Sequence, residues 1–269
     1  MVTTLAQHAP DFWSWRGGVF EFQQPIAWSL TQDPQASLEP ALIDGTKSAA
    51  IADPAELQQQ ITELAAQEPD SPLLASLYKD LGHAYKDAVN YSDAKIAYSQ
   101  ALILREKHLG KDHPDTATSL NNLAGLYESM GRYSEAEPLY VRSLAISEAQ
   151  LGPDHPATAT SLNNLAGLYE SMGRYSEAEP LYVRSLAISE AQLGPDHPAT
   201  ATSLNNLAGL YESMGRYSEA EPLYVRSLQI RTRALGQDHP QTQGCINSFA
   251  DFLKKIIAAG QADQLSDHP

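Results

Sequence analysis

The sequence predicts an all-α solenoid, in which equal units of two antiparallel helices stack on one another. The first observation is a repeat that is identical letter for letter, because residues 116–186 reappear unchanged as residues 158–228, an offset of 42 residues. The second is an apolar stripe of helical spacing in each unit, and the third is a set of Pro and Gly residues at the turns. Units of this size bury their apolar faces only against their neighbours, so one continuous core is expected.

The first helix of each unit is predicted by the stretch that follows Pro114. Its apolar residues recur at the spacing of one helix face: Leu120, Leu123, Ala124 and Tyr127. Pro114 suits the first helical position, because the amide hydrogen that proline lacks is not needed there. Gly131 can adopt the left-handed conformation that ends a helix, so the first helix is expected to end there.

The second helix is expected to begin directly after the first. Ser134 and Glu137 have the spacing of a capping box, with Ser134 at the N-cap. Two neighbouring stripes follow, with Ala136, Tyr140, Leu144 and Ser147 in one and Leu139, Ser143, Ile146 and Gln150 in the other. A helix with so wide an apolar arc contacts neighbours on two sides, as in a solenoid. Pro138 is expected in its first turn and Gly152 at its end.

Diverged units flank the identical copies. An upstream unit has small and aromatic residues at matching positions, namely Leu81, Gly82, Tyr85, Ala94 and Tyr98. Downstream, Pro240 begins a helix that no second helix follows, which is typical of a solenoid cap. Asp53 followed by Pro54 predicts one more helix, over residues 54–67, ahead of the first unit. The expected organisation is an N-terminal segment, an extra helix, four units, a capping helix and a tail, over residues 1–50, 51–71, 72–239, 240–258 and 259–269.

The N-terminal segment, residues 1–50, is rich in aromatic residues and is expected to be mostly irregular. All three tryptophans lie in it, and the alternation through Phe20 and Phe22 after Gly17-Gly18 is consistent with a short hairpin. One hypothesis is that its aromatic residues cap the first helices. Another is that they occupy the groove of this solenoid, or of a second copy, as a built-in ligand formed by Phe12, Trp13 and Trp15. A disordered arm is the third alternative.

Small residues at fixed points and a tyrosine on each helix resemble the tetratricopeptide repeat (TPR). The matching positions are Leu123, Ala124, Tyr127, Ala136, Tyr140 and Ser143, with their equivalents in the next two copies. That family usually repeats every ~34 residues. The longer period, with the segments LNNLA, YSEAEPLY and LGPDHP, more closely resembles kinesin light chains and their bacterial relatives. The resemblance covers roughly residues 72–258 and implies a right-handed superhelix whose first helices line a concave groove.

The same resemblance implies which side chains line the groove. They form ladders at equivalent positions: Asn121, Asn163, Asn205 and Asn247; Glu128, Glu170 and Glu212; Ser129, Ser171 and Ser213. A row of amides can hold the backbone of an extended peptide regardless of its side chains. The alternative is that the asparagines bond to neighbouring helices. Gly125 and its equivalents would leave room for a ligand to approach.

The charge of the groove predicts which peptides bind. Residues 115–131 and their copies contain no lysine or arginine, so the clamp that related proteins use for a peptide carboxylate is not expected. Kinesin light chains bind acidic cargo peptides in a basic groove, whereas this groove would offer glutamates, with arginines at its rim: Arg132, Arg174 and Arg216. We therefore expect a preference for neutral or basic peptides.

Composition excludes several classes of function. A net charge of -15 argues against a nucleic-acid or anionic-membrane partner. The chain has a single cysteine, Cys245, and no signal peptide or long apolar run. We therefore expect a soluble, cytoplasmic and monomeric chain, with self-association through the N-terminal segment or the solenoid ends as the alternative. His113, His155, His197 and His239 recur with the period, but stacked units lie on the order of 10 Å apart. We interpret these histidines as helix caps and expect no metal, no cofactor and no enzymatic activity.

The predicted function is a protein-interaction scaffold or adaptor that binds extended peptide segments in the groove. One alternative is a regulatory or sensor segment of a bacterial signalling protein. Another is a cargo adaptor of the kinesin light chain type, although the chain lacks the heptad coiled coil with which such chains join a motor.

Overall fold

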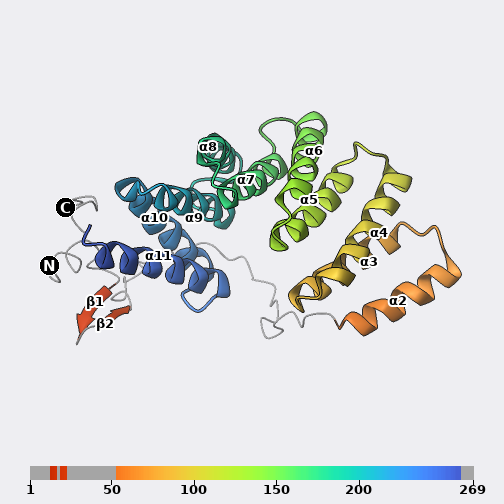
Figure 1. Ribbon diagram of the computed structural model, residues 1–269, viewed down its shortest axis with the longest axis horizontal. Helices are drawn as coiled ribbons and strands as arrows, with labels where there is room; N and C mark the ends of the chain where they lie inside the picture. Colours follow the sequence, from red (N-terminus) through yellow and green to blue (C-terminus); the bar gives the residue numbers. More distant parts are fainter. Residues whose placement is uncertain (1–12, 17–18, 23–52, 262–269) are drawn as a thin grey trace, which may run out of the picture. The chain divides into compact units, whose positions relative to one another are not determined.

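The computed structural model describes residues 13–16, 19–22 and 53–261, and within them ten helices and one pair of strands. The helices are α2 (Pro54–Gln67), α3 (Leu73–Asp87), α4 (Tyr91–Leu109), α5 (Pro114–Ser129), α6 (Tyr133–Leu151), α7 (Pro156–Ser171), α8 (Tyr175–Leu193), α9 (Pro198–Ser213), α10 (Tyr217–Leu235) and α11 (Pro240–Ala258). They follow one another along the chain as hairpins (Figure 1).

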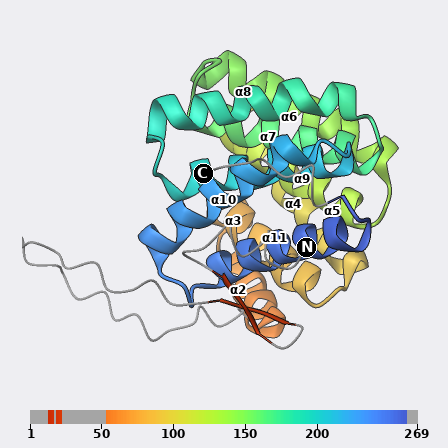
Figure 2. The ribbon, with the colours of Figure 1, turned by 90° about the vertical axis from the view of Figure 1, so that its left-hand side faces the viewer.

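The helices pair as predicted for a solenoid. We call α3, α5, α7, α9 and α11 the A helices, and α4, α6, α8 and α10 the B helices. Each of the first four A helices packs against the B helix that follows it, and each of α4, α6 and α8 packs on the next A helix. The A helices α3, α5, α7 and α9 also contact one another in order, whereas α6 and α8 run along the outer side of α7 and α9 (Figure 2). The expected all-α solenoid of antiparallel helix pairs is confirmed.

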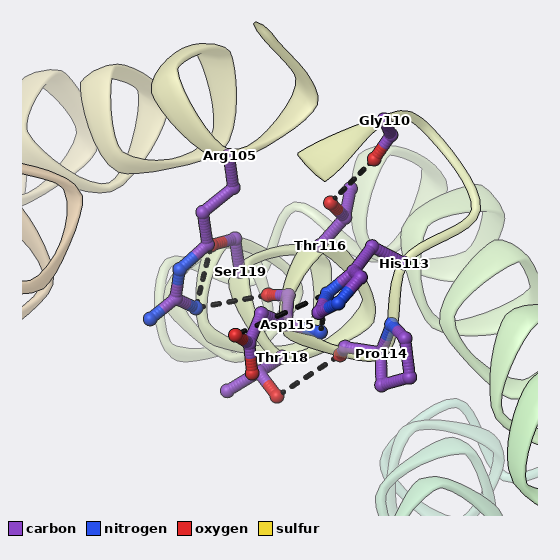
Figure 3. A network of polar contacts seen from close by, with 8 residues as sticks. All are labelled: Arg105, Gly110, His113, Pro114, Asp115, Thr116, Thr118 and Ser119. Carbon is purple, nitrogen blue, oxygen red and sulfur yellow. Dashed lines mark hydrogen bonds and ion pairs between the residues drawn. The ribbon is translucent and has the colours of Figure 1, made fainter. Parts of the chain in front are cut away.

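Histidine caps start α5, α7 and α9, as the sequence predicted. The Nδ1 atom of His113 accepts a hydrogen bond from the backbone N–H of Asp115 at 3.1 Å (Figure 3). His155 and His197 make the same contact with the N–H of Ala157 and Ala199, also at 3.1 Å. The cap satisfies one of the helix N–H groups that have no partner within the helix.

A second set of polar contacts fastens the turn before α5 (Figure 3). The hydroxyl of Thr116 donates to the carbonyl of Gly110 at 2.8 Å. Arg105 of α4 donates to the carbonyl oxygen of Asp115 at 2.9 Å and to the hydroxyl of Ser119 at 3.0 Å. These bonds fasten α4 to the start of α5.

The predicted capping box at the start of the B helices is wrong. The N-cap residue of α6 is Arg132, and Ser134 already lies inside the helix. The turn at Gly131, whose φ is 69°, is so tight that the N–H of Arg132 still bonds to the carbonyl of Tyr127 at 2.8 Å. The chain is therefore helical again from Tyr133, and Pro138 lies in the second turn of α6 and not in the first.

Leucine, alanine and tyrosine fill the space between the helices. Leu120, Ala124 and Ala136 are fully buried, and Tyr140 nearly so. Only glycine fits at position 82, because a Cβ there would lie 2.5 Å from the ring of Tyr98. The small residues at fixed points therefore set how closely the A and B helices approach.

The described strands form the hairpin that the sequence suggested. Strand β1 (Trp13–Arg16) pairs with β2 (Val19–Phe22) in antiparallel register, with Trp13 opposite Phe22 and Arg16 opposite Val19.

Candidate peptide-binding face

The A helices α5, α7 and α9 form a continuous layer, because side chains of one reach the next. Asn121 of α5 donates to the hydroxyl of Ser161 on α7 at 3.4 Å. Ser171 of α7 donates to Oε1 of Glu128 on α5, also at 3.4 Å, and Ser213 of α9 repeats this contact with Glu170 at 3.3 Å. We define the A-helix face as the predicted ladder residues of α5, α7 and α9: Asn121, Asn163, Asn205, Glu128, Glu170, Glu212, Ser129, Ser171 and Ser213.

The asparagines of this face lie half-buried between adjacent A helices. The Oδ1 atoms of Asn121, Asn163 and Asn205 are buried and accept no hydrogen bond from any residue of the described part of the chain. An acceptor buried without a partner costs free energy. The fourth predicted residue, Asn247, is exposed on α11.

Each glutamate of the face is held by a tyrosine of its own unit. The hydroxyls of Tyr140, Tyr182 and Tyr224 donate to Oε2 of Glu128, Glu170 and Glu212 at 2.9, 3.0 and 3.0 Å. Together with the serine contacts, these bonds fix the carboxylates at the layer's surface. The sequence shows the tyrosines and glutamates at a fixed spacing, but it did not reveal that they pair.

Burial changes the titration of these groups. Desolvation raises the pKa of Glu170, although the hydroxyls of Tyr182 and Ser213 stabilise the carboxylate and act in the opposite direction. The neighbouring charge of Glu212 raises the pKa of Glu170 further. Three tyrosines also have a raised pKa, namely Tyr140, Tyr182 and Tyr224. Burial is the larger cause and the negative charge of the nearby glutamates is the smaller one, so the tyrosine hydroxyls stay protonated and donate hydrogen bonds.

Arginines beside the face are already engaged. Arg174 donates to Glu177 at 2.7 Å and to Glu137 of the preceding unit at 2.9 Å, and its guanidinium lies 4.2 Å from the ring centre of Tyr169. The carboxylates raise the pKa of Arg174. Arg216 repeats the arrangement with Glu219 and Glu179. These arginines join consecutive B helices, a role that sequence reasoning missed.

The glycines of the A helices make room for tyrosine hydroxyls. A Cβ on Gly125 would lie 3.2 Å from the hydroxyl oxygen of Tyr140, and one on Gly167 would lie 3.4 Å from that of Tyr182. The space beside these glycines, which the sequence assigned to a ligand, therefore holds the Tyr–Glu hydrogen bonds.

The sequence itself matches a known family over this region. A family model described as the tetratricopeptide repeat matches residues 90–149, 115–191, 162–233 and 204–242, which together span more than half of the chain. This chain belongs to the tetratricopeptide repeat family. Such repeats generally mediate protein–protein interactions, and the fold is typically a non-catalytic scaffold. A search of the curated proteins finds no match.

Solved structures of TPR proteins are similar to this chain over most of its length. BtubC (BKLC) from P. vanneervenii is 26% identical with a TM-score of 0.63, over 80% of this chain and 84% of that protein. A putative kinesin light chain from Podosopora anserina, with nearly identical TPR-like repeats, is 25% identical with a TM-score of 0.58, over 72% of this chain and 92% of that protein. The resemblance to kinesin-light-chain-like TPR proteins is confirmed.

The remaining predicted site residues lie apart from the TPR helices in the sequence. Phe12 falls outside the described residues, and Trp13 and Trp15 belong to β1, whose backbone alone is described.

Two further features of the TPR chain bear on its chemistry. No cluster of His, Cys, Asp and Glu within the described ranges has an arrangement that could hold a metal ion. Among the helices that the structure describes, none combines the length and the apolar character needed to cross a membrane.

Proposed function

We propose that this TPR chain is a protein-interaction scaffold or adaptor that binds an extended peptide along the A-helix face. The proposal draws on the family, whose repeats mediate protein–protein interaction. It also draws on the continuous layer of α5, α7 and α9, which presents the same polar side chains in the same order three times.

The observation that carries the proposal is the set of three asparagine Oδ1 atoms without a hydrogen-bond partner. A small rotation of each amide would turn this acceptor toward the surface of the layer. A backbone N–H of an extended peptide could then donate to it, which would remove the cost of the unpaired acceptor. Because backbone N–H groups are common to all peptides, such a ladder supplies affinity without demanding one sequence.

Charge gives the ligand its class. The A helices α5, α7 and α9 contain no lysine or arginine, and Glu128 and Glu170 form no ion pair with any residue between 53 and 261. A face with carboxylates and amide oxygens as hydrogen-bond acceptors favours ligands that carry hydrogen-bond donors. We therefore propose neutral or basic peptides as ligands.

A second candidate is a cargo adaptor of the kinesin light chain type. The similarity to a putative kinesin light chain from Podosopora anserina favours it. This candidate predicts binding of acidic peptides, so one experiment separates the two.

The experiment is a fluorescence-anisotropy titration of the full chain with neutral, basic and acidic extended peptides. We expect the basic and neutral peptides to bind, and the triple variant N121A/N163A/N205A to weaken binding by at least about tenfold, since three hydrogen bonds are removed. The matched control is Q150A/Q192A, which removes two exposed amides from the B helices. Tighter binding of acidic peptides, with an affinity that falls steeply with salt, would contradict the proposal.

A further inference from the structure

A glutamate, an arginine and a tyrosine meet where the second unit packs on the third. Arg174 donates through Nη1 to Oε1 of Glu137 at 2.9 Å, and its guanidinium lies 4.2 Å from the ring centre of Tyr169. Burial raises the pKa of Tyr169, and the charge of Glu137 raises it further. The carboxylate of one unit is therefore held by an arginine and a tyrosine of the next.

The next interface along the solenoid repeats this arrangement. Arg216 donates through Nη1 to Oε1 of Glu179 at 2.7 Å, and its guanidinium lies 4.1 Å from the ring centre of Tyr211. In both arginines, Nε and Nη2 bind the glutamate three residues further along the chain. Nη1 is thus the group that binds a carboxylate of the preceding unit.

The interface between the first two units has the same arginine and tyrosine but no such carboxylate. The residue equivalent to Glu137 is Lys95. Its ammonium lies 5.9 Å from the ring centre of Tyr127, and the guanidinium of Arg132 lies 4.9 Å from the same ring. Nε and Nη2 of Arg132 bind Glu135. Within residues 53–261, Nη1 of Arg132 has no hydrogen-bond acceptor and Lys95 forms no ion pair.

The first interface therefore holds two positive charges beside one ring, where each later interface holds one positive and one negative charge. The side chain of Arg132 is 38% exposed, against 31% for both Arg174 and Arg216, so solvent reaches it more readily. A negative group beside Lys95 and Arg132 would relieve the repulsion between them. Arginine binds carboxylates through directed N–H groups, and lysine adds a compact charge.

We propose that Lys95 and Arg132, beside the ring of Tyr127, form a binding site for an acidic side chain of a partner protein. The ligand carboxylate takes the place that Glu137 and Glu179 fill at the next two interfaces, and it accepts a hydrogen bond from Nη1 of Arg132. The site uses none of the residues of the A-helix face, so it stands or falls separately from the proposed function.

The first test is a fluorescence-anisotropy titration of the full chain with a short labelled peptide that carries two adjacent glutamates in a Ser/Gly background. We expect Lys95→Glu to weaken binding at least about fivefold, because it removes an attractive charge and adds a carboxylate that competes for Arg132. The matched control is Lys111→Glu, which changes the net charge equally at an exposed lysine between α4 and α5. Equal losses in the two variants would show an effect of net charge alone and overturn the site.

The second test moves the site by one unit. The double variant K95E/E137K has the net charge of the unmodified chain, supplies Arg132 with a carboxylate and places a lysine beside Arg174. We expect its affinity for the acidic peptide to return to within about twofold of that of the unmodified chain. If the double variant binds as weakly as Lys95→Glu, the lysine–arginine pair does not bind the ligand and the proposal is overturned.

A basic extended peptide, titrated in parallel, separates this site from the A-helix face. Lys95→Glu should leave the affinity for the basic peptide within about twofold of its value in the unmodified chain. If the acidic peptide does not bind the unmodified chain, the carboxylate site is overturned and the proposed function is not. If neither neutral nor basic peptides bind but the acidic peptide does so through Lys95, the proposed function fails and the carboxylate site stands.

Discussion

The hydroxyl of Tyr182 on α8 donates to one carboxylate oxygen of Glu170 on α7 at 3.0 Å, while Ser213 on α9 donates to the other at 3.3 Å. One side chain of the candidate site therefore links three helices of two consecutive units. The packing of these two units therefore depends on the state of this carboxylate.

Glu170 should make stability depend on pH in a defined direction. Burial raises the pKa of Glu170 in the folded state, so the folded chain holds this proton more tightly than the unfolded chain does. The associated stability is present below the usual pKa of a glutamate and is lost as pH rises through the raised pKa. We expect the stability of Glu170→Gln, relative to that of the unmodified chain, to increase as the pH rises above about 4.

Urea denaturation at several pH values measures this difference. The variant Tyr182→Phe removes a hydrogen bond that lowers the pKa of Glu170, so it should enlarge the pH dependence. If the difference in unfolding free energy between Glu170→Gln and the unmodified chain did not change with pH, the carboxylate of Glu170 would be as well solvated in the folded state as in the unfolded state.

The Asn ladder and the core should respond differently to alanine. Leu165 is 4% exposed, and Leu165→Ala should cost about 2–5 kcal/mol of unfolding free energy because it leaves a cavity. Asn163→Ala removes an amide whose Oδ1 has no partner, so stability should change little while peptide affinity falls. If both variants lose similar stability in thermal denaturation, the ladder serves the fold and not a ligand.

Val89 should destabilise the first unit. Val89 has a φ of 59° and its side chain is 66% exposed. The equivalent residues of the next three units are glycines, namely Gly131, Gly173 and Gly215, with φ angles of 69°, 72° and 74°. A β-branched residue in this conformation costs about 1–3 kcal/mol. Val89→Gly should therefore raise the unfolding free energy by about 1 kcal/mol in urea denaturation, less than the full strain because glycine gains freedom in the unfolded chain. The reciprocal control, Gly173→Val, should lower it.

The histidine caps should behave as ordinary helix caps. His155→Ala removes the acceptor for the N–H of Ala157 and should cost about 1 kcal/mol. His155→Asn supplies a side-chain oxygen of similar reach and should recover most of the loss. The measurement is thermal unfolding followed by circular dichroism, and equal melting temperatures for all three chains would show that the contact contributes nothing.

The built-in ligand hypothesis for the N-terminal segment has its own test. The variant F12A/W13A/W15A of the full chain should bind a basic extended peptide more tightly if these residues occupy the A-helix face. If they cap the helices instead, the variant should unfold at lower temperature with unchanged peptide affinity. The two readouts, melting temperature and peptide Kd, assign the segment to one role or the other.

The fold could be predicted from the sequence because local and global signals agree. Pro114 and Gly131 mark the ends of α5, and the structure has α5 end at Ser129 with Gly131 in the left-handed conformation. The period of the chain then requires the same pair of helices to recur, and α7 with α8 and α9 with α10 do so. His113 was interpreted as a cap from its position alone, and the structure agrees.

Contacts between helices, and the turns that set them, could not be predicted in the same way. The spacing of Ser134 and Glu137 satisfied a local rule, but the tight turn made Arg132 the N-cap residue. Nothing local indicates that Arg174 reaches Glu137 across 37 positions, or that Tyr182 holds Glu170. Such pairs depend on how two helices face each other, which is set by packing and not by a pattern within one helix.

The identity of the copies also makes the interface between α6 and α7 chemically equal to that between α8 and α9. Loss of residues 158–199 would place Thr200 where Thr158 now stands, and α6 would meet α9 through the side chains that it now presents to α7. Gain of one such block would likewise create only surfaces that the molecule already has. Recombination within the gene can therefore lengthen or shorten the stack of helices, and with it the A-helix face, by one whole unit without a new kind of contact while the fold stays the same.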